Sequence, residues 1–213
     1  MILFISGIGT NIGKSVVTGY LYKKMLNRGI RVITQKLIQT GCTHTPEDVE
    51  THRKIAGVPF TAEDKSGLTC PYIFTYPCSP HLAAEIDKRT IDLAYLTACT
   101  KQLSERYDTV LLEGAGGLMV PLTREVLTID YVAQQKYPVA LVTSGILGSL
   151  NHTLLSLEAL KNRNMKLHSI IYNRYPSSDS LIEADSLDFI REYCKIYFPN
   201  AEIELLNLLE EKK

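Results

Sequence analysis

Short, nearly unbroken apolar runs alternate along the chain with longer stretches in which apolar residues recur at helical spacing. We expect a strand at each apolar run, because helices cover both faces of a parallel sheet. The predicted strands are 2–5, 30–36, 108–113, 137–144 and 167–173. The predicted helices are 16–27, 45–57, 80–87, 92–107, 128–136, 150–164 and 180–198. This alternation predicts an α/β fold, a single domain over residues 1–213 with a mostly parallel sheet and helices on both faces.

Two segments fit this alternation less simply. Residues 58–80 contain several prolines around the apolar piece PYIFTYP, which predicts a loop excursion with one short strand. Residues 202–209 predict either a short strand or a short helix.

A glycine loop joins the first predicted strand to the first predicted helix, in the stretch MILFISGIGTNIGKS. Strand, glycine loop and helix in this order let backbone N–H groups converge on an anion at the positive end of the helix. Lys14 can reach the β- and γ-phosphates of a nucleotide, and the Ser15 hydroxyl can hold Mg²⁺. The spacer between Gly7 and Gly13 has five residues instead of the usual four. A turn that only caps a helix would not call for Lys-Ser in the first helical turn, so the stretch predicts nucleotide-phosphate binding.

Polar and glycine residues gather at the carboxyl ends of the predicted strands, where ligands lie in such sheets. They are Gly7 to Ser15, Lys36, Glu113 with the following GAGG, Ser144-Gly145 and Asn173.

Each polar group at these strand ends can be interpreted either as part of a binding site or as a residue with only a structural or solvent-exposed role. Glu113 is placed as the acidic Mg²⁺ partner of a phosphate-loop enzyme, although a strand end also suits a solvated acid. Asp48 lies in a first helical turn, where the helix dipole alone favours an acid. Lys36 is either a second cation beside the transferred phosphoryl group or a lysine that reaches solvent. The helix start in LGSLN (147–151) either receives a substrate carboxylate or is simply capped by Ser149.

Composition narrows the classes of partner. The 23 basic and 23 acidic residues balance, so no excess positive charge exists to neutralise a nucleic acid or a membrane surface. The five cysteines are odd in number and form no Cys-x-x-Cys pair, as expected of a reduced, cytoplasmic protein. No apolar stretch is long enough to span a membrane, and no signal peptide is expected.

Six pieces of the sequence resemble, in order, the motifs of the dethiobiotin synthetase family. They are GIGTNIGKS, K-x3-TG after the second strand, CSPHLAAE, VLLEGAGGLMVPL, GILGSLNHTLLS and IIYN. The resemblance implies a P-loop NTPase fold and a homodimer that binds MgATP, CO2 or bicarbonate, and 7,8-diaminononanoate. In the implied reaction, one amine captures CO2 as a carbamate and ATP phosphorylates that carbamate. The second amine then closes the cyclic urea and expels phosphate.

The resemblance also implies roles for matching positions. Lys36 looks like the catalytic lysine beside the carbamate, Lys14 like the phosphate-bridging lysine, and Thr10 like the hydroxyl near the carbamate. Ser15, Asp48 and Glu113 match the Mg²⁺ ligands. The implied ATP contacts are Asn11, Ile12, Gly13, Lys14, Ser15, Val16, Asp48, Glu113, Gly114, Ala115, Gly116 and Asn173. The implied substrate contacts are Thr40, Pro80 and Gly117, and, across the dimer interface, Gly148, Ser149, Leu150 and Asn151.

The carboxyl-terminal part departs from that family. Its stretch FPNAEIELLNLLEEKK lacks the Gly-x-[Ile/Leu]-Pro turn that lines the purine base in family members, so we expect weak discrimination among nucleotides. A switch-like ATPase that positions plasmids or division proteins is the main alternative. Such ATPases usually carry a second lysine early in the phosphate loop, where this chain has Ile8. An amidotransferase-type synthetase and a catalytically dead scaffold are further alternatives.

Overall fold

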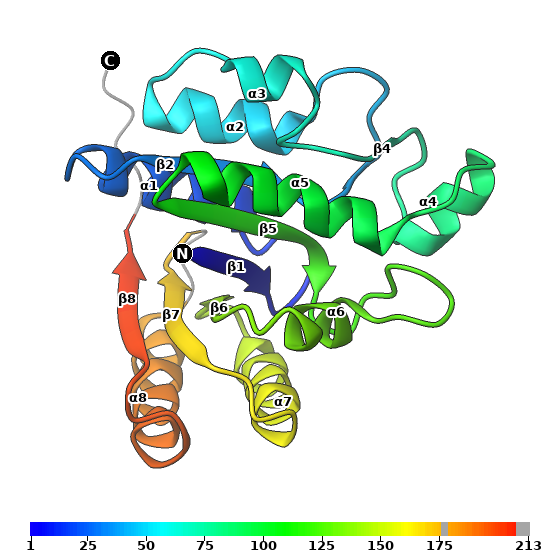
Figure 1. Ribbon diagram of the computed structural model, residues 1–213. Coiled ribbons are helices and arrows are strands. Elements are labelled where there is room, and N and C mark those ends of the chain that lie inside the picture. The colour runs from blue at the N-terminus through cyan, green and yellow to red at the C-terminus, as the bar shows by residue number, and fades with distance from the viewer. Residues whose placement is uncertain (176–178, 208–213) are drawn as a thin grey trace.

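The computed structural model describes residues 1–175 and 179–207, and its centre is a six-stranded parallel sheet (Figure 1). The strand order is β2-β5-β1-β6-β7-β8, and every neighbouring pair is parallel. The strands are β1 (Ile2–Gly7), β2 (Val32–Lys36), β5 (Thr109–Gly117), β6 (Val139–Ser144), β7 (Leu167–Asn173) and β8 (Glu202–Leu206). The predicted α/β fold with a mostly parallel sheet is confirmed.

Helices cover both faces of this sheet, as the unbroken apolar strands predict. On one face, Leu3 and Ile5 of β1 share a core with Val17 and Leu21 of α1 (Lys14–Leu26), beside which α2 (Glu47–Ala56) packs. On the other face, Phe4 belongs to a larger core to which the remaining long helices contribute. These helices are α5 (Leu93–Arg106), α6 (Thr128–Gln134), α7 (Ser149–Asn162) and α8 (Ser180–Tyr197). Successive side chains of β1 therefore point to opposite cores, as strand geometry requires.

The excursion between α2 and α5 contains more regular structure than predicted. A single helical turn, α3 (Ala62–Lys65), starts at Thr61, whose hydroxyl accepts from the N–H of Asp64 while the Asp64 carboxylate accepts from the N–H of Thr61. The predicted short strand is β4 (Ile73–Phe74), and it pairs in parallel with an unpredicted β3 (Gln39–Thr40). The predicted helix at 80–87 is present as α4 (Pro80–Ile86).

The expectation that strand 108–113 ends before its glycines is wrong, because β5 continues to Gly117. The pairing of β1 with β5 shifts register between Ile5 and Gly7 and resumes with Gly7 opposite Gly117. A Cβ on Gly117 would lie 3.3 Å from the Gly7 carbonyl oxygen, so this close backbone approach favours a residue without a side chain. The last segment is a strand over 202–206, and its predicted remainder at 208–209 lies outside the described residues.

Candidate functional site

The loop from β1 into α1 ends in a helix start that is suited to an anion. Asn11 and Gly13 have φ values of 59° and 94°, which turn the chain sharply before Lys14 begins the helix. No side chain caps the first turn of α1 and no acidic residue lies in it, so its N–H groups have no side-chain acceptor. A Cβ on Gly13 would lie 2.5 Å from Asn173 Nδ2, so both the backbone conformation and the packing require glycine there.

Lys14 lies against its own loop, where Nζ donates to the Gly9 carbonyl at 2.8 Å. Burial and the nearby Lys36 cation lower the pKa of Lys14 to about 8, although Glu113 and Asp48 oppose the shift. The Lys14 ammonium therefore lies beside the start of α1, where it can bind an anion together with the backbone N–H groups.

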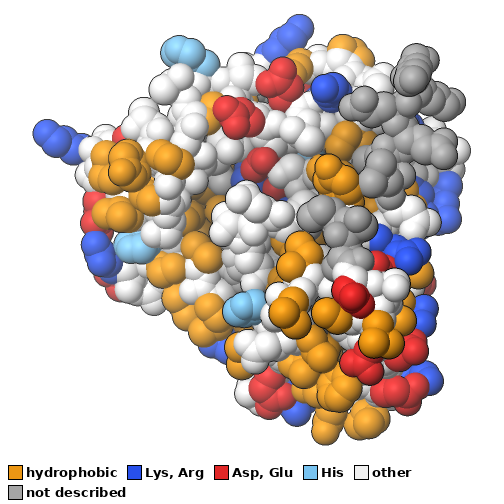
Figure 2. Space-filling view, turned by 180° about the vertical axis from the view of Figure 1, so that it is seen from behind, with side chains coloured by type: hydrophobic (Ala, Val, Ile, Leu, Met, Phe, Trp, Pro, Cys, Tyr) orange, Lys and Arg blue, Asp and Glu red, His pale blue; other side chains and the backbone are white. Residues whose placement is uncertain are grey.

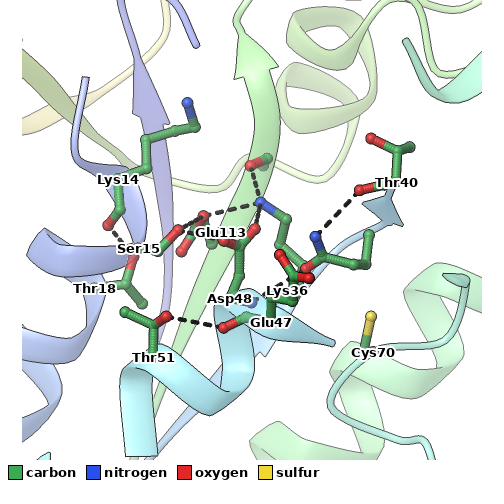
Figure 3. A network of polar contacts seen from close by, with 12 residues as sticks. Lys14, Ser15, Thr18, Lys36, Thr40, Glu47, Asp48, Thr51, Cys70 and Glu113 are labelled. Carbon is green, nitrogen blue, oxygen red and sulfur yellow. Dashed lines mark hydrogen bonds and ion pairs between the residues drawn. The ribbon is translucent and has the colours of Figure 1, made fainter. Parts of the chain in front are cut away.

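Lys36 lies at the centre of a buried charge cluster, which we call the Lys36 cluster and define as Ser15, Lys36, Asp48 and Glu113 (Figure 3). Lys36 Nζ lies 2.5 Å from Asp48 Oδ2 and 2.9 Å from Glu113 Oε1. It also donates to the Gly114 carbonyl at 3.0 Å. Lys36 ends β2 directly opposite Glu113 of β5, so the strand register holds the pair together.

The charges of this cluster stabilise one another. Burial favours neutral Lys36, but the Glu113 and Asp48 carboxylates outweigh it and raise the pKa of Lys36. Burial likewise opposes ionisation of Glu113, but the Lys36 ammonium and a hydrogen bond with His52 outweigh it and lower the pKa of Glu113. Both groups are therefore charged at neutral pH.

Three oxygen donors converge in the Lys36 cluster. The Ser15 hydroxyl lies 2.6 Å from Asp48 Oδ1 and 3.0 Å from Glu113 Oε1. Among residues 1–175 and 179–207 there is no group of three His, Cys, Asp or Glu side chains that could hold a metal ion. One hydroxyl and two carboxylates nevertheless suit Mg²⁺, which prefers oxygen ligands and keeps several of its waters.

A cavity of about 820 Å³ opens over the loop and the Lys36 cluster. It brings together most of the residues predicted for ATP, metal and carbamate. Those lining it are Thr10, Asn11, Gly13, Lys14, Ser15, Val16, Lys36, Thr40, Asp48, Pro80, Glu113, Ala115 and Gly116. The sequence analysis missed other lining residues, namely Ile38, Gln39, Thr51, Pro77, Cys78, Ser79 and Val120. The strand that ends at Lys36 predicts that the following loop lies at the carboxyl edge of the sheet, and this signal could have identified Gln39 as a lining residue.

A second cavity of about 450 Å³ adjoins the first, since Thr10, Gly116 and Val120 line both. Gly117 lines it, together with apolar side chains that include Leu118, Met119 and Leu155. His152 on α7 also lines this cavity.

The other predicted residues lie outside both cavities. Residues 148–151 form the start of α7, where the Ser149 hydroxyl is buried against Ser144 Oγ at 3.0 Å. Asn173 Nδ2 donates to the Ile12 carbonyl at 3.0 Å, so these two residues contact each other behind the loop. The Gly114 carbonyl contacts Lys36, while a Cβ on Gly114 would lie 2.6 Å from Phe4 Cζ.

The chain is similar over most of its length to several proteins named ATP-dependent dethiobiotin synthetase. The ATP-dependent dethiobiotin synthetase BioD 2 of Pasteurella multocida (strain Pm70) is 53% identical over 208 residues, covering 98% of each chain. The protein of the same name from Haemophilus ducreyi is 46% identical over 206 residues, covering 97% of this chain and 98% of that one. ATP-dependent dethiobiotin synthetase BioD of Chlorobaculum tepidum is 48% identical over 207 residues, covering 97% and 87% respectively.

Broader comparisons agree on the fold. A family described as an AAA domain matches residues 2–213. The signal recognition particle receptor FtsY from Elizabethkingia anophelis superimposes with a TM-score of 0.54 at 14% identity, covering 99% of this chain and 59% of that one. At that identity the likeness shows the fold alone. The extent and identity of the sequence matches show that the chain belongs to the ATP-dependent dethiobiotin synthetase family.

Proposed function

We propose that this protein closes the cyclic urea of dethiobiotin from 7,8-diaminononanoate and CO2, with conversion of ATP to ADP and phosphate. The relatives named dethiobiotin synthetase match nearly the whole chain. The observation that carries the proposal is that the Lys36 cluster and the glycine loop between β1 and α1 line the same cavity. We also propose that residues 1–213 form a single synthetase domain.

The reaction needs an electrostatic clamp, because the carbamate, the triphosphate and the leaving phosphate are all anions. In our proposal, Lys36 holds the carbamate oxygens and Thr10 donates a hydroxyl hydrogen bond near them. Lys14 and the N–H groups at the start of α1 bind the phosphates. The carbamate oxygen attacks the γ-phosphorus and ADP leaves. The second amine then attacks the carbamoyl carbon, phosphate leaves, and the amine proton is lost as the ring closes.

Ser15, Asp48 and Glu113 would hold Mg²⁺, which neutralises part of the triphosphate charge when it is bound with the nucleotide. Their convergence through the Ser15 hydroxyl supports this assignment. Lys36 touches both carboxylates, so the cation for the carbamate and the metal ligands form one connected unit.

The alkyl chain of the diamine suits the second cavity, whose lining includes Leu118, Met119 and Leu155. Because Thr10 and Gly116 line both cavities, an amine of a substrate held there would reach the phosphate side. In our proposal, residues 148–151 of a second copy receive the substrate carboxylate.

A homodimer is therefore part of the proposal. Exposed hydrophobic side chains gather over α7 and α8 and over α4 (Figure 2). Leu147, just before α7, is 82% exposed, and Leu155, which lines the second cavity, is 60% exposed. Burying these side chains between two copies would remove apolar surface from water beside the substrate site.

Apart from the second copy, the partners in the proposal are small molecules, and neither nucleic acid nor a membrane takes part. The balanced charge of the chain supports this view. Within the part of the chain that the structure describes, no helix has the length and apolar character needed to cross a membrane.

Product analysis with diaminononanoate, bicarbonate and MgATP tests this function. We expect cyclic urea from the native protein, and loss of that product in Lys36→Ala while nucleotide still binds. Nucleotide hydrolysis without urea would instead indicate a switch-like ATPase, and binding without turnover would indicate a scaffold. Full urea formation by Lys36→Ala would exclude Lys36 from the chemistry.

A further inference from the structure

His52 lies behind the Lys36 cluster and outside both cavities. It is fully buried on α2, one helical turn after Asp48. Its Nε2 lies 2.7 Å from Glu113 Oε2, and its Nδ1 lies 3.1 Å from the Thr34 hydroxyl. Nothing in the reaction described above uses this imidazole. The spacing of four between Asp48 and His52 is the sequence signal that could have placed both on one helix face.

Arg53, the next residue of α2, belongs to the same hydrogen-bond network as His52. Arg53 NH1 lies 2.7 Å from the Thr34 hydroxyl oxygen, and a guanidinium can only donate. Thr34 therefore accepts from Arg53, and its own hydrogen is free to point at His52 Nδ1. Because the Glu113 carboxylate is ionised and can only accept, His52 Nε2 carries a hydrogen and donates it to Glu113 Oε2.

Arg53 is itself held rigidly, so the chain of bonds has a fixed origin. Its Nε and NH2 atoms donate to the two oxygens of Asp64 at 2.8 and 2.7 Å. Asp64 also accepts from the N–H of Thr61 at 2.7 Å and from the Thr69 hydroxyl at 2.6 Å. Arg53 and Asp64 are both buried, with side-chain exposures of 2% and 1%.

The two oxygens of Glu113 consequently face different groups. Oε2 is bound by His52, whereas Oε1 is shared by Lys36 and Ser15 at the cavity. A carboxylate held in this way cannot rotate about its last bond without losing the imidazole hydrogen bond. It presents one defined oxygen to the cavity.

We propose that His52 is a positioning residue that orients Glu113 through Oε2, so that Oε1 is fixed for the divalent cation bound with the nucleotide. This inference rests on the proposed function for the role of Glu113. Residues that orient metal ligands change metal affinity when they are replaced, by about 10- to 100-fold. His52 therefore sets the affinity for the cation without touching the nucleotide.

The test compares His52→Leu with His52→Gln. Leucine is an apolar side chain without a donor, whereas the glutamine amide can place an N–H near the position of Nε2. The control is Thr100→Val, because Thr100 is also fully buried and its hydroxyl donates to Gln35, the neighbour of Thr34 on β2. Thr100 lines neither cavity. Its loss changes a buried polar contact without reaching Glu113.

The measurement is the affinity for Mn²⁺ in the presence of ADP, from electron paramagnetic resonance of the free ion. Mn²⁺ is a suitable probe because it shares the preference of Mg²⁺ for oxygen ligands. We expect His52→Leu to weaken Mn²⁺ binding by about 10-fold or more. His52→Gln should retain most of the Mn²⁺ affinity, and Thr100→Val should leave it unchanged. These differences in affinity should not follow the stabilities of the variants, measured as the midpoints of their unfolding in urea.

Several results would overturn the inference: native Mn²⁺ affinity in His52→Leu, equal losses in the leucine and glutamine variants, or a similar loss in Thr100→Val. Nitrogen NMR of the histidines gives a second test that does not depend on the folding of His52→Leu. We expect a hydrogen on Nε2, and a ring that carries its hydrogen on Nδ1 alone contradicts the assigned direction. Native protein that binds Mn²⁺ as expected but does not form the cyclic urea product would overturn the proposed function and leave the positioning role supported.

Discussion

Replacing Lys36 by methionine removes the charge at the centre of the site while keeping an unbranched chain of similar length. In the native protein this ammonium balances Glu113, which is fully buried, and Asp48, whose side chain is 24% exposed. Removing one partner of a buried ion pair costs about 3–5 kcal/mol, because the other charge is left without compensation. Asp48 keeps partial hydration and Glu113 keeps its bond to His52, so we expect a loss of about 3 kcal/mol.

Urea unfolding at pH 7 in the presence of a chelator measures this loss. A cost of about 3 kcal/mol is large against the 5–15 kcal/mol by which domains are stable. The double variant Lys36→Met with Glu113→Gln removes the fully buried uncompensated charge and leaves only the partly exposed Asp48 without its partner, so we expect it to recover more than half of that loss. A Lys36→Met protein as stable as the native one, or a double variant that recovers nothing, would refute the reasoning.

Three further predictions follow from other contacts. Gly114→Ala places a Cβ 2.6 Å from Phe4 Cζ, so thermal unfolding should show a loss of about 1–3 kcal/mol, part of which Phe4→Leu should restore. Burial opposes ionisation of Asp64, but hydrogen bonds from Arg53 and Thr69 outweigh it and lower the pKa of Asp64, so its carboxylate stabilises the fold above about pH 4 and stabilises it less as the pH falls. The Asp64→Asn variant should therefore be less stable at pH 7 and should show a flatter acid-unfolding profile, and an unchanged profile would contradict this. Both ends of the Asn173 amide contact backbone, at Ile12 and Tyr175, so ATP, GTP and CTP should support similar rates of urea formation, whereas a strong preference for ATP would contradict weak base discrimination.

Much of the fold is predictable because most strands of the central sheet are short segments rich in apolar residues that alternate with helical patterns. The strand over 167–173 is found with the predicted limits, and helix 180–198 differs by one residue. The errors lie where tertiary contacts decide the conformation. β5 extends over the glycines because Gly7 approaches Gly117, and β3 exists only because β4 lies beside it. Neither contact has a local signal in the sequence.

The candidate site was predictable to a similar depth. The loop, Lys36 and Glu113 each end or follow a strand, and the strand ends of a parallel sheet meet at one edge. The sequence could not show that β2 and β5 are neighbours, which puts Lys36 directly opposite Glu113. His52 was missed because a buried histidine within a helix resembles core packing unless its partners on other strands are known.

The Lys36 cluster is better explained by its ligands than by the needs of the fold. A buried lysine between two carboxylates gains little over apolar side chains of the same size, because desolvation offsets most of the attraction. Here the register of β2 and β5, the Asp48 turn of α2 and the His52 bond all serve to hold that arrangement. In the proposed reaction these prepositioned charges bring a carbamate to a triphosphate. The carbamate takes the place of one present acceptor of Lys36, because the three ammonium hydrogens now face Asp48, Glu113 and the Gly114 carbonyl. The same charges explain why the first cavity lies at the ends of β1, β2 and β5, while the second, more apolar cavity lies toward α7.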